Sequence, residues 1–517
     1  MSQTTHRGQL TLPLYPEEYW YGGCVSDGHQ MPYGAKTDFS RDLTVNLTEN
    51  QAAPLLISNQ GRYIWSETGF AFTFRDGILT VDTDAELYLG EGFGTLRGAF
   101  QAVSQRFFPP SGDVPPEAFF SAPQFNTWIE LLFNQNQQDV LTYAQTLIEK
   151  GYPAGVLMID ATWAEHFGNF SFHSGRFPDP KGMVEQLHAW GFRVMLWESP
   201  FVTADTLTFR TLAQKGYLIR NPKGEVAIKH WWDGYSAMLD MTNPETVAWL
   251  TEQNEKLMTE YGIDGFKLDA GDPLYYDADD VTYAPTTPNG HSEIWAKFGL
   301  RYPYNEYRAC FKCGGQALVQ RLCDKQHSWA ANGLGALVPH TLAQGLLGYT
   351  FGCPDMIGGG QYGSFLRNSG RLDQELFVRY AQCAAMMPMM QFSAAPWRVL
   401  DPENEALCRQ AALLHTRYGD LFWQLAREAA ATGEPIVRSL EYVCPHQGFA
   451  AVTDTFMLGD DLLVAPVLNK GETVRNVPFP TGCWVNETTG ESIQGPTTRD
   501  IPVTPDTLLI YKRATNN

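Results

Sequence analysis

The chain has 517 residues, of which 44% are hydrophobic and 18% are charged, and this balance excludes a disordered protein because it supplies a large apolar core. Lysine and arginine number 37 against 57 aspartate and glutamate residues, and the net charge of −20 without a basic run argues against nucleic acid or an anionic membrane as a partner. Aromatic residues make up 13% of the chain; they suit the flat faces of sugars but are equally ordinary core material.

The first residues and the cysteines bear on the compartment of the protein. MSQTTHRGQL lacks the charged and apolar segments of a signal peptide, and the sequence holds no apolar run long enough to span a bilayer. Nine cysteines, an odd number between Cys24 and Cys483, are typical of reduced thiols. Cys310 and Cys313 form a pair near Cys323, but a second pair at zinc spacing is missing. We therefore expect a soluble, cytoplasmic protein with structural thiols and no metal ion.

Residues 1–121 alternate short apolar runs with turn residues, as in LTVNL, LLISN and FAFTF, and Asp76-Gly77 marks a hairpin turn. This pattern predicts an N-terminal β-sandwich. From Phe125 the pattern changes to alternating strands and helices, with AGVLMID, RVMLWES and GFKLD among the strands. The helices include PETVAWLTEQNEKLMTEYG, a helix over 292–313 and a helix over 334–347.

Residues 122–430 thus predict a parallel sheet with helices outside, and their length suits a closed barrel that ends in a helical connector. A doubly wound open sheet is the rival, but no GxGxxG opens a helix after the first strand. Residues 431–517 predict a smaller β domain. The expected fold class is α/β, a (β/α)8 TIM barrel flanked by an N-terminal β-sandwich and a C-terminal β-sandwich.

Several carboxylates end predicted barrel strands, where barrel enzymes place their catalytic groups. They are Asp160, Glu198, Asp240, Asp269 and Asp355. Each one alone is as well explained as a helix N-cap or loop residue, but their clustering indicates a site. Asp269 stands out because Lys267 precedes it on the same strand face and Gly271 permits a tight turn before Asp272. A carboxylate kept ionised beside a lysine suits a nucleophile.

The stretch GIDGFKLDAGD resembles the nucleophile motif of glycoside hydrolase family 31, the retaining α-glycosidases. HWWDGYSAMLDMTNPE, GLLGYTFGCPDMIGGG, ELFVRYAQCAAMMPMMQFSAAPWR and the segment from SLEYVCPHQ to FMLGDDLLVAPVL agree with that resemblance. WYGGCVSDGHQMPYG, NGLGALVPHTL, CPDMIGG and QFSAAPWR resemble a subgroup of the family whose members act as α-galactosidases. The resemblance covers nearly the whole chain and implies the same order of domains.

The resemblance also implies roles for individual residues. Asp269 matches the nucleophile, and a further set falls where the family lines or braces the pocket for the terminal sugar: Asp160, Trp232, Lys267, Asp272, Arg321, Trp329 and Asp355. Gln391 and Ser393 replace the Arg-x-His of most of the wider family, so we expect them to bind the sugar in the manner of the subgroup. Trp397 completes the substrate-binding set, although packing beside the barrel is the alternative for all three tryptophans. Asp240 is expected to be structural.

One position departs from the family. The subgroup's acid/base is an Asp that directly precedes Asn-Gly-Leu, and this position is Ala331 here. A retaining glycosidase needs one carboxylate to attack the sugar and a second carboxyl group to protonate the leaving oxygen and later activate water, so we expect strongly impaired activity. Either Ala331 is an engineered substitution that traps substrate, which the intact surroundings favour, or the chain is a natural pseudoenzyme. Asp324 and Asp272 are the nearest substitutes, the first displaced along the chain and the second already bracing the site.

The function implied is that of a retaining exo-α-glycosidase for terminal α-linked sugars, above all α-galactosides. An α-glucosidase, an α-xylosidase or a sulfoquinovosidase is the alternative within the family, and a non-catalytic carbohydrate-binding protein is the alternative outside catalysis. The partner is then a small oligosaccharide or glycoside. No cofactor is expected, because two-carboxylate hydrolysis needs none and the 11 histidines show no ligand spacing. The oligomeric state stays open, a homo-oligomer included.

Overall fold

Two antiparallel sheets form the N-terminal part of the computed structural model, which describes residues 2–368, 370 and 372–514. Among these residues, one sheet runs β1 (Ser2–Arg7), β9 (Glu86–Glu91), β6 (Tyr63–Ser66), β5 (Ala52–Ser58), β3 (Trp20–Cys24), and the other runs β2 (Leu10–Pro13), β8 (Ile78–Asp82), β7 (Ala71–Arg75), β4 (Phe39–Asp42). In β7, Phe72 and Phe74 are buried and Thr73 between them is not, because alternate side chains of a strand face the core. The predicted sandwich is confirmed, with the Asp76-Gly77 turn between β7 and β8.

Helix α1 (Leu96–Phe107) follows the two sheets, and the strand pattern predicted for residues 1–121 does not include it. The side chain of Thr95 caps the helix by accepting a hydrogen bond from the Gly98 amide. Leu96, Phe100 and Val103 are buried at the three- and four-residue spacing of a helix face. The helix therefore packs one apolar stripe against the sheet that contains β5, β6 and β9.

The central sheet is a ring of parallel strands. In the described part of the chain its order is β10 (Gln124–Asn126), β11 (Val156–Ile159), β12 (Arg193–Glu198), β16 (Gly265–Leu268), β17 (Tyr304–Tyr307), β18 (Gln320–Arg321), β19 (Gly352–Cys353), with β20 (Gln391–Phe392) on the other side of β10. A parallel bridge from Met356 to Gln391 joins the segment after β19 to β20. The predicted (β/α)8 barrel is thus confirmed, in a nearly closed form.

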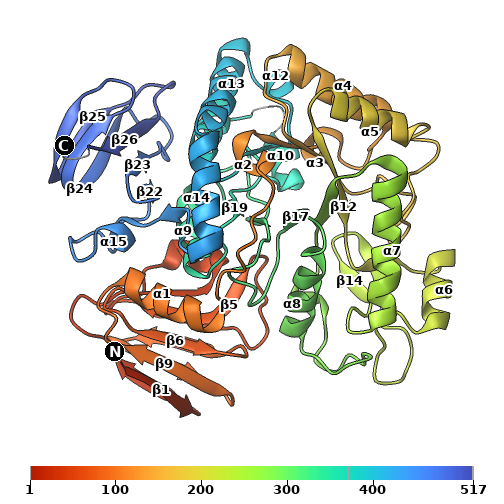
Figure 1. Ribbon diagram of the computed structural model, residues 1–517, viewed down its shortest axis with the longest axis horizontal. Coiled ribbons are helices and arrows are strands. Elements are labelled where there is room, and N and C mark those ends of the chain that lie inside the picture. Colours follow the sequence, from red (N-terminus) through yellow and green to blue (C-terminus); the bar gives the residue numbers. More distant parts are fainter. Residues whose placement is uncertain (1, 369, 371, 515–517) are drawn as a thin grey trace.

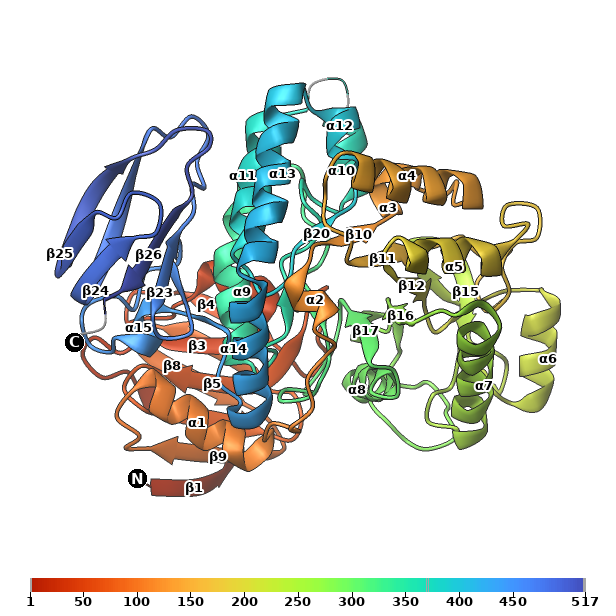
Figure 2. The ribbon, with the colours of Figure 1, turned by 45° about the horizontal axis from the view of Figure 1, so that its top comes forward.

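Helices surround the barrel, as Figures 1 and 2 show. The longer ones are α4 (Gln137–Glu149), α5 (Pro180–Ala189), α6 (Leu207–Lys215), α7 (Pro244–Tyr261), α8 (Pro288–Gly299), α9 (Leu337–Leu346), α11 (Gln374–Ala385), α13 (Pro402–Arg417) and α14 (Gly419–Thr432). Short turns of helix connect them: α2 (Ala118–Ser121), α3 (Trp128–Leu131), α10 (Tyr362–Asn368), α12 (Pro396–Val399), α15 (Leu440–Val443), and the 3-10 helices η1 (Val25–Gln30), η2 (Pro273–Tyr275) and η3 (Leu334–Ala336). In the described residues, no helix is both long and apolar enough to cross a membrane.

The helix predicted over 292–313 is wrong beyond its first half. α8 ends at Gly299, and β17 follows as a barrel strand. Pro303 stands between them and cannot continue a helix, because it has no amide hydrogen and its ring clashes with the preceding turn. The strand does not look like an apolar run because Asn305 and Glu306 are polar, yet both are buried.

A small antiparallel sheet is inserted after β12. It consists of β13 (Phe201–Thr203), β15 (Gly234–Met238) and β14 (Lys229–Trp231), with β15 in the middle. The ring of Trp231 stacks on that of Phe201 with 4.0 Å between ring centres, which fixes the β14–β15 hairpin against β13. The insertion lies on the carboxyl side of the barrel strands, because it leaves directly from the end of β12.

The C-terminal strands form one antiparallel sheet with its own apolar core around Trp484. Its order among the described residues is β21 (Val437–Arg438), β22 (Phe456–Leu458), β23 (Leu462–Ala465), β26 (Leu509–Arg513), β24 (Val474–Asn486), β25 (Ser492–Pro502). α13 and α14 separate this sheet from the barrel (Figure 2), and the expected C-terminal β domain is confirmed.

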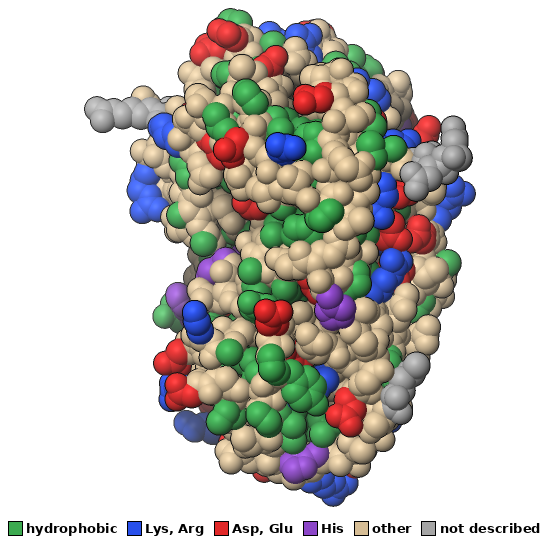
Figure 3. All heavy atoms as spheres, turned by 90° about the vertical axis from the view of Figure 1, so that its left-hand side faces the viewer, with side chains coloured by type: hydrophobic (Ala, Val, Ile, Leu, Met, Phe, Trp, Pro, Cys, Tyr) green, Lys and Arg blue, Asp and Glu red, His purple; other side chains and the backbone are tan. Residues whose placement is uncertain are grey.

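On the face of the molecule at the left of Figure 1, which Figure 3 shows as spheres, acidic and basic side chains are intermixed.

Candidate active site

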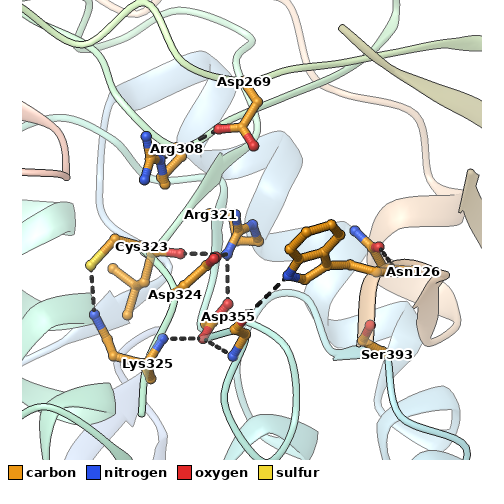
Figure 4. A network of polar contacts seen from close by, with 12 residues as sticks. Asn126, Asp269, Arg308, Arg321, Cys323, Asp324, Lys325, Asp355 and Ser393 are labelled. Atoms are coloured by element: carbon orange, nitrogen blue, oxygen red, sulfur yellow. Dashed lines mark hydrogen bonds and ion pairs between the residues drawn. The ribbon is translucent and has the colours of Figure 1, made fainter. Parts of the chain in front are cut away.

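Charged side chains converge at the carboxyl ends of the barrel strands. Asp160 follows β11, Asp269 follows β16, and Arg308 follows β17. Figure 4 shows Asp269 pointing toward Arg308, with Arg321 close to Asp324 and Asp355 below them. Strands from across the sequence therefore supply one polar cluster, as the barrel topology requires.

Asp269 is the centre of this cluster and is only 8% exposed. Its Oδ2 accepts a hydrogen bond of 2.9 Å from Nε1 of Trp197 and lies 3.8 Å from Nζ of Lys267. Its Oδ1 lies 3.4 Å from Nε of Arg308. Burial raises the pKa of Asp269, but Arg308, Lys267, Arg321 and the Trp197 hydrogen bond together hold that pKa well below its usual range. The carboxylate is therefore ionised.

The turn after Asp269 is tight. Ala270 and Gly271 both have left-handed backbone conformations, with φ of 54° and 71°. A Cβ on Gly271 would lie 2.3 Å from Cδ1 of Trp295, so only glycine fits there. The Ala270 amide, turned back by this geometry, donates a hydrogen bond of 2.9 Å to Asp269 Oδ1. The turn thus orients the carboxylate.

Two ion pairs flank Asp269. Lys267 Nζ lies 2.7 Å from Asp160 Oδ2, with both side chains buried. Arg308 Nη2 lies 2.8 Å from Asp272 Oδ2, and burial raises the pKa of Asp272 to about 6 against the lowering effect of Arg308. The Arg308 guanidinium also lies 4.9 Å from the ring centre of Trp232, a side chain that is 45% exposed.

Arg321 organises the floor of the site and is 1% exposed. Its Nη1 lies 2.6 Å from Asp355 Oδ1 and 2.9 Å from Asp324 Oδ1, and its Nε lies 3.3 Å from Glu306 Oε1. Asp355 Oδ2 accepts further hydrogen bonds from the amides of Lys325 and Gly360. Burial raises the pKa of Asp355 to about 6, although Arg321 lowers it. These contacts fix the buried side chains of Arg321 and Asp355 relative to one another.

Gln391 and Ser393 lie in the same region but are fully buried. Gln391 Nε2 donates to Glu306 Oε2 at 2.9 Å and to Gln124 Oε1 at 3.1 Å, inside the barrel. Ser393 Oγ accepts from the Ile129 amide at 2.7 Å. The polar groups of both side chains thus form hydrogen bonds with other residues of the chain.

The loop after β18 contains Trp329 and Ala331. Trp329 Nε1 donates to Asp373 Oδ2 at 3.0 Å, and Asp373 also pairs with Lys470. Ala331 is exposed at the turn that follows. Its methyl group offers neither a proton nor a hydrogen-bond acceptor at this position of the loop.

Three residues from the sequence analysis lie away from the cluster. Trp397 packs its ring 5.9 Å from Tyr143 and 6.2 Å from Tyr152, on the outside of the barrel. Glu198 points toward α7, where Oε2 accepts a hydrogen bond from Asn254, and burial raises its pKa to about 8. Asp240 accepts hydrogen bonds from the Thr242 and Tyr283 amides, which fits the structural role expected of it.

Arg308, Trp197 and Glu306 were not among the residues singled out from the sequence. Glu306 lies in β17 and Arg308 directly follows that strand, within the segment that we assigned to a helix, and Pro303 was the signal that could have revealed the strand. Trp197 lies in the predicted strand RVMLWES, directly before the carboxylate that drew attention instead. Because successive side chains point to opposite faces, Trp197 faces Asp269 while Glu198 faces α7.

Comparison with known proteins identifies the family. Residues 114–424 match the TIM-barrel domain of glycosyl hydrolases family 31, and residues 433–515 match the C-terminal domain of the same family. The chain belongs to glycosyl hydrolase family 31. Within the described residues of this family member, no group of three His, Cys, Asp or Glu side chains is placed to hold a metal ion.

Relatives of the chain are longer than the chain itself. Myogenesis-regulating glycosidase of Mus musculus is 35% identical over 394 residues, which cover 74% of this chain and 54% of the relative. Alpha-glucosidase 2 of Bacillus thermoamyloliquefaciens is 26% identical over 409 residues, which cover 73% of this chain and 50% of the relative. The chain spans about half the length of these two relatives.

Solved structures share the fold. A family 31 dextranase of Flavobacterium johnsoniae, solved with glucose, superposes with a TM-score of 0.83 at 18% identity. The superposition covers 98% of this chain and 66% of the dextranase. The N-terminal sheets, the barrel and the C-terminal sheet therefore form an arrangement common to both proteins.

Proposed function

We propose that the chain is a retaining exo-α-glycosidase that acts on terminal α-linked sugars, with α-galactosides as its substrates. The observation that carries the proposal is the buried, ionised Asp269, held by Trp197 and Arg308 at the end of a barrel strand. Such a carboxylate can attack an anomeric carbon and form a glycosyl ester through an oxocarbenium-like transition state. The choice of galactose is supported by the resemblance of the sequence motifs.

The surrounding residues suit a pocket for one sugar ring. Asp160 and Lys267 provide an acceptor and a donor on one side of Asp269, and Trp232 provides an aromatic face on the other. Sugar rings bind through hydrogen bonds from their hydroxyls and through contact with aromatic faces. Asp272, Arg321, Asp355, Gln391 and Ser393 support this pocket, and Trp329 borders it. The division of the chain at residues 121 and 430 is part of the same proposal.

Ala331 sets the limit of this activity. Without a carboxyl group at this position, no acid from this loop protonates a sugar alkoxide as it leaves, and general acid catalysis of that kind typically contributes a factor of about 10²–10⁴ in rate. Substrates whose leaving group needs no proton are not affected in this way. We therefore expect the chain to react most readily with glycosyl fluorides.

The test is to trap the glycosyl-enzyme. α-Galactosyl fluoride with a second fluorine on the sugar ring reacts with the nucleophile and then hydrolyses slowly, so the adduct accumulates. Intact-protein mass spectrometry should show one fluorinated sugar per chain, and peptide mapping should locate it on Asp269. If an adduct formed only with the corresponding glucosyl or xylosyl fluoride, the proposed substrate would change from galactosides to glucosides or xylosides. The absence of an adduct with all three fluorides would refute the proposal.

A second candidate is a carbohydrate-binding protein without turnover, and Ala331 is the observation that favours it. Calorimetric titration with methyl α-galactoside, together with a fluoride-release assay, separates the two candidates. Heat of binding without any release of fluoride from α-galactosyl fluoride would support the binding protein.

Replacing Trp197 tests what keeps Asp269 ionised. Trp197→Phe removes the donor to Oδ2, and because that hydrogen bond stabilises the charged carboxylate, the pKa of Asp269 rises. In Trp197→Phe, the acid limb of the plot of kcat/KM against pH for α-galactosyl fluoride should move to higher pH. At a given pH on that limb, kcat/KM should fall by about tenfold. Trp163→Phe is the matched control, because its Nε1 donates to the Trp197 carbonyl at 2.8 Å and not to the carboxylate. A limb unchanged in Trp197→Phe would contradict this role.

A further inference from the structure

Another carboxyl group, that of Asp233, interacts electrostatically with Asp269 and has no part in the function proposed so far. Asp233 lies at the tip of the β14–β15 hairpin, where Trp231 pairs with Gly234 and leaves Trp232 and Asp233 as the two loop residues. Its side chain is half-buried. The hairpin comes from the insertion after β12, on the carboxyl side of the barrel.

The two residues before Asp233 bring it to the nucleophile. The ring of Trp231 lies 6.5 Å from that of Trp197, whose Nε1 donates to Asp269 Oδ2. The ring of Trp232 lies under the guanidinium of Arg308, whose Nε is 3.4 Å from Asp269 Oδ1. Each tryptophan is therefore one contact away from Asp269, from a different side.

The base of the hairpin is fixed to the loop that follows the nucleophile. Lys229 Nζ in β14 lies 2.7 Å from Asp277 Oδ2 and 2.6 Å from Asp280 Oδ1, and the Lys229 side chain is almost fully buried. Both carboxylates come from the segment after η2, which continues from Asp269. The position of the hairpin tip relative to Asp269 is thus set by the fold.

The charges around Asp233 favour its neutral form. Burial raises the pKa of Asp233, and the nearby carboxylates of Asp160 and Asp269 raise it further, against the effect of a hydrogen bond with Trp232. Among the described residues, no Lys, Arg or His nitrogen lies within ion-pair distance of the Asp233 carboxyl group. The two cations near Asp269 pair with other carboxylates, Lys267 with Asp160 and Arg308 with Asp272. The Asp324 carboxylate, by contrast, does have a cation beside it, because its Oδ1 lies 2.9 Å from Nη1 of Arg321.

The carboxyl groups of Asp269 and Asp233 thus interact electrostatically, and their environments shift their pKa values in opposite directions. Such a pair is the arrangement by which hydrolases separate a nucleophile from a proton donor. The half-buried position also leaves Asp233 accessible to the water that the second step requires.

We propose that Asp233 performs the proton transfers that Ala331 cannot, an inference that rests on the proposed function. In the first step the Asp233 carboxyl gives its proton to the glycosidic oxygen while the bond from C1 to that oxygen breaks and Asp269 bonds to C1. An alcohol leaves and a glycosyl ester remains. In the second step Asp233 takes a proton from water, the water oxygen bonds to C1, and the ester electrons return to Asp269, which restores both groups.

The dependence of the rate on the leaving group tests this assignment. Asp233→Ala should lower kcat/KM for methyl α-galactoside by about 10²–10⁴-fold, because that alcohol must be protonated as it leaves. With α-galactosyl fluoride, whose leaving group needs no proton, Asp233→Ala should lower the rate of the glycosylation step by less than about tenfold. Azide should then speed turnover of the fluoride by Asp233→Ala and yield α-galactosyl azide, while the unchanged protein should not respond.

Two comparisons make the outcome decisive. Asp279→Ala removes an exposed carboxylate from the neighbouring loop and should leave all these rates unchanged. Equal losses of Asp233→Ala on both substrates without a response to azide would assign Asp233 to sugar binding and overturn the proposal, as would full activity. If the unchanged protein forms no adduct with the fluorinated trap, the proposed function itself fails; an adduct in both proteins with equal losses overturns only the role of Asp233.

Discussion

Asp269→Asn should abolish reaction with α-galactosides, with a loss in kcat/KM of at least about 10⁴-fold even for α-galactosyl fluoride. The amide keeps the size of the side chain but is a far weaker nucleophile toward C1. The variant should also form no adduct with the fluorinated trap. The measurement is fluoride release in steady state together with intact mass.

Asp264→Asn is the matched control for that substitution. Asp264 lies at the opposite end of the same strand, where Oδ2 contacts His188 Nε2 and the Val194 amide, both at 2.7 Å. Its replacement should affect stability and leave the chemistry intact, because it lies on the amino side of the barrel. Comparable activity loss in both variants would mean that folding and not nucleophilic attack explains the result.

Arg321→Met should be the most destabilising single substitution in the site, with a loss of about 3–5 kcal/mol in the free energy of unfolding. The change leaves the buried carboxylates of Asp355 and Glu306 without their cation. Urea unfolding followed by tryptophan fluorescence measures the loss. Arg398→Met, which removes the half-exposed pair with Glu130, should cost only about 0–1 kcal/mol.

The loss of unfolding free energy caused by Arg321→Met, called the deficit below, should become smaller as the pH falls. Burial already raises the pKa of Asp355 to about 6 and raises that of Glu306, while Arg321 lowers both, so without Arg321 both pKa values rise further. The folded variant then binds protons more tightly than the unfolded chain, so its stability increases as the pH falls. The deficit should therefore shrink between about pH 7.5 and about pH 5.5. A deficit that is constant or grows toward low pH would exclude this explanation.

Much of the fold could be predicted from the sequence because its signals are local. The spacing of apolar residues in AGVLMID and GFKLD identifies buried strands, and a carboxylate at the end of each strand falls on the same rim of a parallel barrel. Asp160, Lys267 and Asp269 are brought together by that rule alone. β17 was missed because it contains the polar residues Asn305 and Glu306, which are nevertheless buried, so that it does not form the apolar run expected of a barrel strand.

The missed part of the site depends on contacts that local patterns do not contain. Arg308 reaches Asp269 only because β17 lies next to β16, and Trp232 reaches Arg308 only because the hairpin folds over the barrel end. Trp397 was expected in the pocket because of the family resemblance, with packing beside the barrel as the alternative, and its ring lies 5.9 Å from that of Tyr143. The residues that contact Asp269 thus follow from strand order and from the insertion, which require the folded chain.

The inserted sheet has a consequence for how sugar specificity can change. β13, β14 and β15 lie in one continuous stretch between β12 and α7, and their contacts with the barrel end include the stacking of Trp231 on Trp197 and the Lys229 ion pairs. The stretch lies outside the barrel strands and outside the turn that holds Asp269, but its Trp231 and Trp232 contact Trp197 and Arg308, which in turn contact Asp269. A change in the length or sequence of this stretch would therefore place different side chains beside Asp269 while the residues of the barrel strands stay the same.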